Sequence, residues 1–169
     1  MKIAIQIIFL LISLNFVSCK SVSKEKEKIN KSSFPTPRGI INDFSHIFSQ
    51  EQKAQLHKIL YDYEIKTTKQ IVVVTVDSIN PYTNIQKYTS DLGNNWGVGS
   101  KKTNNGLAIV LCKPCKKIGI ATGIGTQLVL TNSICKQVID KTIIPQFNNE
   151  QYYLGIEKGI LELIEQWQP

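Results

Sequence analysis

Residues 105–132 read NGLAIVLCKPCKKIGIATGIGTQLVLTN, and this stretch decides the fold. Two apolar runs, residues 106–111 and 117–122, are joined by a very short segment, which predicts two strands paired as a β-hairpin. The hairpin is followed by the glycine-containing sequence TGIGTQ and then by LTN. Thr131 in the second of these motifs precedes an apolar helical pattern, so it predicts a helix N-cap.

The segment before the hairpin predicts a helix, a strand and a second helix. Ser49 and Gln52 form a capping-box signature, and apolar side chains then recur at helical spacing, at Leu56, Ile59, Leu60 and Tyr63. Residues 71–76 are a continuous β-branched run, as expected for a strand covered on both faces. Thr83 with Gln86 predicts the cap of a second helix, which ends at the glycines of residues 97–99.

Two more helices are predicted after the hairpin. The third begins at Thr131 and ends near Pro145, and the fourth begins near Glu150. The apolar face of the fourth is formed by Tyr153, Ile156, Ile160, Leu163 and Trp167. We therefore expect one α/β domain over residues 35–169, a three-layer α/β/α sandwich. Its mixed sheet would contain the hairpin and be covered by about four helices.

The order of the motifs resembles that of a TPM domain. The resemblance rests on residues 42–44 (NDF), 96–99 (WGVG), 105–132 and 143–147 (IIPQF), and it covers roughly residues 38–167. This family includes a thylakoid-lumen photosystem-repair protein and many bacterial envelope proteins. The resemblance implies an α/β sandwich, in agreement with the elements read from the residues themselves.

The resemblance also implies a divalent-cation site on loops at the strand ends, and some family members are described as acid phosphatases. The matching positions of this chain are Asp43, Asn105, Gln127 and Asn132. The family usually has glutamate at the third position and aspartate at the fourth. Amide oxygens can bind Ca²⁺ or Mg²⁺, but each replacement removes a negative charge. The resemblance thus implies weak binding of Ca²⁺ or Mg²⁺ at these four residues.

Phosphate hydrolysis at such a site would be metal-assisted, with Asp43 as the base that deprotonates a metal-positioned water. Because the family acids are replaced, we expect residual activity at most. The alternative for Asn132 is a role with Thr131 in helix capping, and that for Asn105 is a turn with Gly106. No Gly-Lys-Ser/Thr phosphate loop and no Gly-x-Ser-x-Gly elbow occur in the sequence, so other hydrolase machinery is missing.

The beginning of the chain indicates export. Met1-Lys2 forms a positive segment, residues 3–14 are apolar apart from a glutamine and a serine, and Val-Ser precedes Cys19. This order resembles the lipobox of bacterial lipoproteins. We expect residues 1–18 to be a signal peptide and Cys19 to carry a lipid that anchors an exported domain at the bacterial cell envelope. An ordinary signal peptide with an incidental cysteine, or a short uncleaved anchor, is the alternative.

Residues 19–34 are predicted to be a flexible, lysine-rich tether because they have almost nothing to bury. Their five lysines and two glutamates account for three of the chain's seven net positive charges. Arg38 is the one arginine among twenty basic residues. Bidentate contacts to phosphate or guanine depend mainly on arginine, so the composition argues against nucleic-acid binding.

Cys112 and Cys115 form a Cys-x-Pro-Cys motif, the arrangement of thiol oxidoreductases. Both flanks are predicted strands, however, so no helix N-terminus would lower the pKa of the first thiol. The same two cysteines could instead form a disulfide across the hairpin turn or remain as free thiols.

Two classes of function follow for the exported domain. One is a weak divalent-cation-binding module with at most residual phosphatase activity. The other is a non-catalytic module that binds an envelope protein, with exposed Tyr82, Trp96 or Tyr152 as contact points. The alternative for each of these three residues is a place in the core, because each fits a helix or turn position. Thiol redox chemistry through Cys112 and Cys115 is a third possibility.

Overall fold

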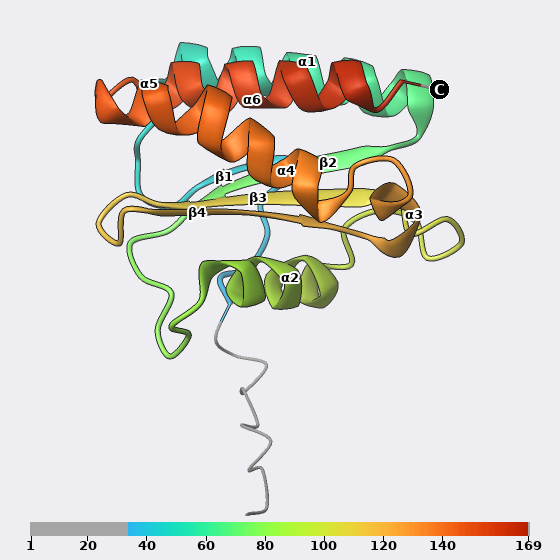
Figure 1. Cartoon of the computed structure of the whole chain (residues 1–169), viewed down its shortest axis with the longest axis horizontal. Helices are drawn as coiled ribbons and strands as arrows, with labels where there is room; N and C mark the ends of the chain where they lie inside the picture. Colours follow the sequence, from blue (N-terminus) through green and yellow to red (C-terminus); the bar gives the residue numbers. More distant parts are fainter. Residues whose placement is uncertain (1–33, 169) are drawn as a thin grey trace, which may run out of the picture. The chain divides into compact units, whose positions relative to one another are not determined.

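A four-stranded mixed sheet organises residues 34–168, the part of the chain that this computed structural model describes (Figure 1). Residues 31–169 form a compact unit of their own. Its elements are β1 (Ile41–Asp43), α1 (Gln50–Thr67), β2 (Gln70–Thr75), α2 (Ile85–Trp96), β3 (Gly106–Cys112), β4 (Lys117–Thr122), α3 (Ile124–Gln127), α4 (Asn132–Val138), a π-helical turn (Ile139–Ile143), α5 (Ile144–Asn148) and α6 (Tyr152–Gln166). The expected signal peptide, Cys19 and the tether up to residue 33 lie outside the described residues.

The strands follow the order β1-β2-β3-β4, in which β1, β2 and β3 are parallel and β4 is antiparallel to β3. Asp43 at the end of β1 is paired with Thr75 at the end of β2. Gln70 at the start of β2 is paired with Gly106 at the start of β3. The sheet therefore has a carboxyl edge, where the three parallel strands end, and an opposite amino edge, where β2 and β3 begin.

Helices cover both faces of the sheet. Figure 1 shows α2 on one face and α1, α4 and α6 on the other. Every residue of β3 and five of the six in β2 are buried, as a strand between two helical layers requires. The predicted three-layer α/β/α architecture is confirmed.

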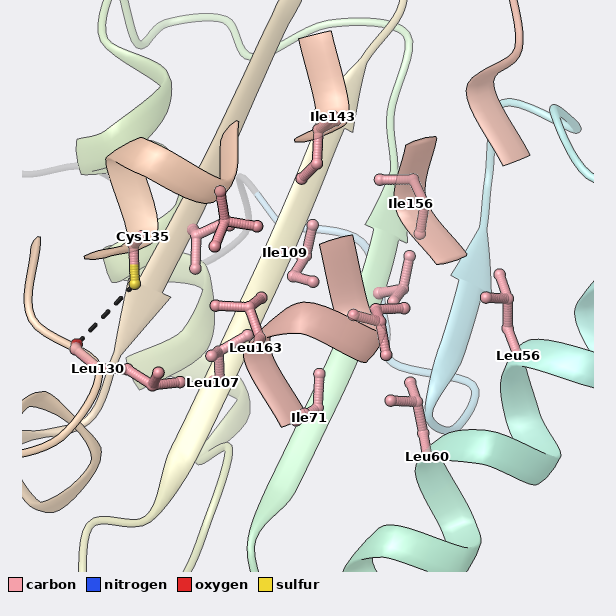
Figure 2. Packing of buried hydrophobic residues seen from close by; sticks show 14 of the residues in the cluster. Leu56, Leu60, Ile71, Leu107, Ile109, Leu130, Cys135, Ile143, Ile156 and Leu163 are labelled. Carbon is pink, nitrogen blue, oxygen red and sulfur yellow. Dashed lines mark hydrogen bonds between the residues drawn. The ribbon is translucent and has the colours of Figure 1, made fainter. Parts of the chain in front are cut away.

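The main hydrophobic core lies between the sheet and the layer of α1, α4 and α6. Figure 2 shows Ile71, Leu107 and Ile109 of the sheet among residues from these helices. The helical side chains of this cluster that are fully buried include Leu56, Leu60, Val138, Ile156, Ile160 and Leu163. The sulfhydryl of Cys135 lies at one end of the core, 3.9 Å from the carbonyl oxygen of Leu130.

The local signals at the first two helices gave one correct cap and one wrong one. The capping box of Ser49 and Gln52 is present in both directions, and α1 begins directly after it. The cap of α2 is Asn84 and not Thr83, because the Asn84 side chain accepts a hydrogen bond from the Lys87 backbone N–H. The predicted stop is confirmed, since Gly97 caps the end of α2 in the left-handed conformation.

The helical segment after Thr131 is longer than predicted. Thr131 caps α4 as expected, but the chain stays helical beyond Pro145 to the end of α5. The turn before Pro145 is π-helical, and the proline lies in the first turn of α5, where its missing N–H is not needed. The short elements β1 and α3 are the two that the sequence patterns did not predict.

The predicted hairpin is confirmed, and its turn is closed by a disulfide. β3 and β4 pair in antiparallel register from Leu107–Thr122 to Cys112–Lys117. Cys112 and Cys115 are bonded to each other, with their Cα atoms 5.2 Å apart. Strands flank the pair on both sides, so the helix that activates the first thiol of an oxidoreductase is not present at this turn.

β4 forms one edge of the sheet, and a side chain covers part of its backbone. The amide of Gln86 in α2 donates a hydrogen bond to the carbonyl oxygen of Ile120 at 2.7 Å. A carbonyl group that would otherwise face outward from the edge strand is thereby satisfied within the chain. Within residues 34–168, each helix is too short or too polar to cross a bilayer.

Candidate functional site

Asp43 ends β1 at the carboxyl edge of the sheet, where its carboxylate holds the following loop. One carboxylate oxygen accepts hydrogen bonds from the Ile47 backbone N–H at 3.0 Å and from the Thr75 hydroxyl at 2.6 Å. The other accepts from the Phe48 backbone N–H at 3.0 Å. The Thr75 side chain is fully buried, so its hydroxyl depends on such a partner. Both oxygens of Asp43 are thus engaged in fixing the entry to α1.

Asn105 lies at the opposite, amino edge, immediately before β3. Its amide oxygen accepts a hydrogen bond from the Ser100 backbone N–H at 2.9 Å, and its amide nitrogen donates to the Thr68 carbonyl oxygen at 2.7 Å. The side chain therefore joins the loop of residues 99–105 to the end of α1. This is the turn-stabilising role that was the alternative to metal binding.

Gln127 and Asn132 lie close together at the same amino edge. Both side chains are exposed, and the Gln127 amide nitrogen is 3.4 Å from the Asn132 side-chain oxygen. The cap of α4 is Thr131, whose hydroxyl accepts a hydrogen bond from the Ile134 backbone N–H. The capping role considered for Asn132 thus falls to Thr131 alone, and the amide of Asn132 faces outward next to Gln127.

The four-residue helix α3 is fastened to the preceding loop by backbone contacts. The carbonyl oxygen of Asn104 accepts hydrogen bonds from the N–H groups of Gly125 at 3.1 Å and Thr126 at 3.3 Å. The buried hydroxyl of Thr126 donates to the Gly106 carbonyl oxygen at 2.9 Å. A Cβ atom added at Gly123 would lie 2.2 Å from the Asn104 carbonyl oxygen, so the close approach requires glycine.

Because of these contacts the loop and α3 behave as one structural unit. We call residues 99–105 and 123–132 the α3 tip. Figure 1 shows both parts at the same end of the sheet, with α3 next to the loop that follows α2. Asn105, Gln127 and Asn132 all belong to the α3 tip.

The structure does not bring Asp43 together with the other three candidate ligands. Asp43 lies beside the end of β2, whereas Asn105 lies beside its beginning, and β2 is six residues long. The strand rise places these two positions roughly 16 Å or more apart. Residues 34–168 also contain no group of three histidine, cysteine, aspartate or glutamate side chains that could hold a metal ion.

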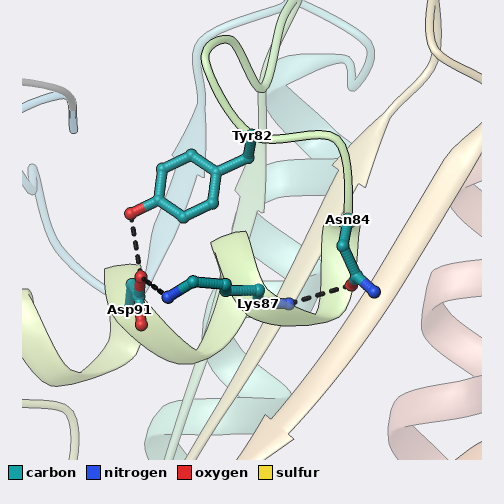
Figure 3. A network of polar contacts seen from close by, with 4 residues as sticks. All are labelled: Tyr82, Asn84, Lys87 and Asp91. Carbon is teal, nitrogen blue, oxygen red and sulfur yellow. Dashed lines mark hydrogen bonds and ion pairs between the residues drawn. The ribbon is translucent and has the colours of Figure 1, made fainter. Parts of the chain in front are cut away.

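The three aromatic residues considered as contact points are more enclosed than predicted. Tyr82 is 7% exposed, and its hydroxyl donates to a carboxylate oxygen of Asp91 at 2.9 Å, which also pairs with Lys87 (Figure 3). Trp96 is half-buried and donates its indole N–H to the Pro35 carbonyl oxygen. Tyr152 is half-buried as well. The prediction of Tyr82 as an exposed contact residue is therefore wrong, because the ring belongs to the packing around α2.

Sequence reasoning missed the exposed apolar residues of the α3 tip. Ile124 is 76% exposed, Leu128 83% and Val129 43%, whereas Leu130 is fully buried. Because apolar residues are expected in the core, the apolar residues of this segment were interpreted as core residues. No sequence signal identifies Thr126 and Leu130 as the buried side of this short segment, so none could have placed Ile124 and Leu128 outward.

A hollow of about 330 Å³ lies at the carboxyl edge, next to the disulfide turn. Lys113, Lys116 and Lys117 line it together with Glu150 and Tyr152. The Lys113 ammonium lies 4.6 Å from the centre of the Tyr152 ring, and the Lys117 ammonium donates to a backbone carbonyl oxygen. Two of the three lysines are therefore already engaged within the chain.

The family model for the TPM domain matches residues 41–166, which span the sheet and all the helices described above. The chain belongs to the TPM domain family. No functionally curated protein matches it. The family match includes the α3 tip and Asp43, so both edges of the sheet belong to the TPM domain.

Solved structures share this TPM domain fold. The N-terminal domain of a protein from P. gingivalis is 27% identical, with 75% of this chain and 80% of that chain covered and a TM-score of 0.69. The BA42 protein from Bizionia argentinensis is 18% identical, with coverage of 73% and 83% and a TM-score of 0.62. The N-terminal domain of the cg2496 protein from Corynebacterium glutamicum is 17% identical, with coverage of 80% and 81% and a TM-score of 0.57.

Proposed function

We propose that this TPM domain is a non-catalytic binding module, exported and held at the bacterial cell envelope by a lipid on Cys19. The observation that carries the non-catalytic part is the environment of Asp43. Its two carboxylate oxygens accept three hydrogen bonds from the protein itself. These bonds commit the carboxylate to holding the loop before α1, which opposes its use as a general base that must contact the attacking water.

The other family positions support the same conclusion. Asn105 uses both ends of its amide to hold backbone groups, and Gln127 and Asn132 carry no charge. A metal-assisted hydrolase requires a site that fixes the ion and a group that accepts the proton of the attacking water. Here the one carboxylate and the three amides lie at opposite edges of the sheet, so they cannot act on the same substrate atom.

The test is hydrolysis of an aryl phosphate by residues 31–169, with Ca²⁺ or Mg²⁺ added. We expect no metal-dependent turnover above that of the buffer. A double variant, Gln127→Glu with Asn132→Asp, restores the acids that the family usually has and serves as the matched comparison. Metal-dependent turnover by the unmodified protein would contradict the proposal.

Weak divalent-cation binding at the α3 tip is a second candidate function. The observation that favours it is the proximity of two exposed amides, Gln127 and Asn132, whose oxygen atoms are suitable ligands for Ca²⁺. Amide chemical shifts followed during titration with Ca²⁺ and then Mg²⁺ test it. Saturable changes confined to the α3 tip, and tighter binding by the variant with the restored acids, are expected. Unchanged spectra at millimolar metal would eliminate this candidate.

The anchor has a separate test. We expect labelled palmitate to enter the full-length protein in bacterial cells and not to enter a Cys19→Ala variant. Equal incorporation into both proteins would show that Cys19 is not the lipidated residue. Thiol redox chemistry finds less support, because the Cys112–Cys115 disulfide closes a turn between two strands.

A further inference from the structure

The α3 tip exposes a concentrated group of large apolar side chains. Six large hydrophobic residues are exposed in residues 34–168, and three of them, Ile124, Leu128 and Val129, lie within six consecutive positions. Ile124 and Leu128 are the two most exposed of the six, at 76% and 83%. Single exposed apolar residues are common on soluble domains, but a cluster at one place marks an interaction surface.

These side chains are presented by a rigid segment. The backbone of α3 is bonded to the carbonyl oxygen of Asn104, and Thr126 and Leu130 are fully buried beneath it. A Cβ atom at Gly125 would lie 2.0 Å from the Thr103 carbonyl oxygen, which shows how closely the two parts of the tip are packed. The outward direction of Ile124 and Leu128 is thus set by the backbone of the fold, and little backbone conformational entropy would be lost when they are covered.

The two charged side chains that belong to the α3 tip itself are both positive. Lys101 and Lys102 lie on the exposed loop of the α3 tip, and neither forms an ion pair with any residue that the structure describes. Between Asp91 and Asp140 the sequence contains six lysines and no aspartate or glutamate. One carboxylate, that of Glu64, approaches the tip, where it accepts a hydrogen bond from the Gln70 side chain, which in turn accepts one from the Gly99 N–H. Apolar side chains next to unpaired lysines match the surface of an anionic bilayer, which is negatively charged at the headgroups and apolar beneath them.

We propose that the α3 tip docks on an anionic lipid bilayer. Ile124, Leu128 and Val129 enter the boundary between headgroups and acyl chains, and Lys101 and Lys102 contact the lipid phosphates. The lipid bilayer would be the partner of the binding module proposed above. This inference rests on that proposed function because it requires the domain to be located at a membrane. The docking itself does not require the lipid on Cys19.

Sedimentation with vesicles tests the proposal on residues 31–169, a compact unit that lacks Cys19. We expect binding to vesicles of phosphatidylglycerol and phosphatidylcholine, weaker binding at high salt, and little binding to phosphatidylcholine alone. Ile124→Ser with Leu128→Ser should weaken binding by at least about tenfold, because two apolar side chains no longer enter the bilayer. Lys101→Gln and Lys102→Gln should each weaken it by about fivefold.

Ile65→Ser and Leu161→Ser are the matched controls, because these residues are also exposed, at 65% and 48%, but lie on α1 and α6. They should leave vesicle binding unchanged, and circular dichroism should show that all variants fold. Equal binding to charged and uncharged vesicles, or an unaffected Ile124 and Leu128 double variant, would overturn the proposal.

A tip without affinity for any vesicle would also overturn it. In that case a photo-crosslinker at position 128 that captures an envelope protein would assign the tip to a protein partner. Neither result would affect the palmitate and phosphatase experiments, so a failure of membrane docking is distinguishable from a failure of the anchored, non-catalytic module.

Discussion

Replacing Asp43 by asparagine should destabilise the fold strongly, although the two side chains have nearly the same shape. The carboxylate accepts hydrogen bonds from Ile47, Phe48 and Thr75. In Asp43→Asn, one acceptor becomes an NH₂ group that faces a backbone N–H, and the remaining bonds lose their charge assistance. A bond to a charged group contributes about 1.5 to 3 kcal/mol, and an unsatisfied buried donor costs a similar amount. For this partly buried site we expect a loss of about 2 to 3 kcal/mol.

Urea unfolding of residues 31–169 measures this loss, with Asp62→Asn as the control. Asp62 is an exposed residue paired with Lys58 on the surface of α1, so its replacement should leave the free energy of unfolding nearly unchanged. A stability for Asp43→Asn that is indistinguishable from that of the control would refute the reasoning. It would mean that the carboxylate is not committed to the loop and is available for chemistry.

The remaining predictions concern a disulfide, two glycines and a buried thiol. Thiol labelling of unfolded, unreduced residues 31–169 should modify Cys135 alone. After reduction, Cys112 and Cys115 should be labelled as well, whereas three labelled cysteines without reductant would contradict the disulfide. Gly93→Ala should stabilise α2 by up to about 1 kcal/mol, because the added Cβ would make an ordinary contact with a neighbouring side chain at 3.4 Å. Gly123→Ala should cost at least about 2 kcal/mol, because its Cβ would collide with a backbone carbonyl oxygen. Thermal unfolding of both variants checks this difference. Burial raises the pKa of Cys135 from 9.0 to about 11, so the stability that it contributes is complete below pH 9 and is lost as the pH rises toward 11. The free energy of unfolding should therefore fall by about 1 to 2 kcal/mol more in the wild type than in Cys135→Ala between pH 8 and pH 10.5, and parallel curves would contradict this assignment.

Much of the fold could be predicted because its long elements carry strong local patterns. The β-branched run of β2, the hairpin and the capping box of α1 each specify a structure without reference to distant residues. β1 has only three residues and exists through its pairing with β2, so no periodicity could reveal it. The four residues of α3 are likewise held by distant carbonyl oxygens and not by helical propensity.

The prediction of the candidate site depended on those same short elements. Asn105, Gln127 and Asn132 are near one another in the hairpin region, so their common location followed from local motifs. Asp43 ends a strand, while Asn105 precedes one that runs parallel to it. Had β1 been predicted, the opposite placement of these two residues would have followed from strand direction alone. The exposure of Ile124 and Leu128 could not be read from hydrophobicity, since burial depends on which side of α3 the core lies.

The hydrogen bond from Gln86 to the edge strand β4 has a consequence for crowding. Proteins gathered on a surface meet copies of themselves far more often than proteins free in solution, and an open strand edge would then extend from one copy to the next. With the Ile120 carbonyl oxygen occupied from within the chain, and with Lys117 exposed at the start of β4, such growth is disfavoured. In the membrane-anchored form proposed above, neighbouring copies would therefore not extend the sheet through β4 at Ile120.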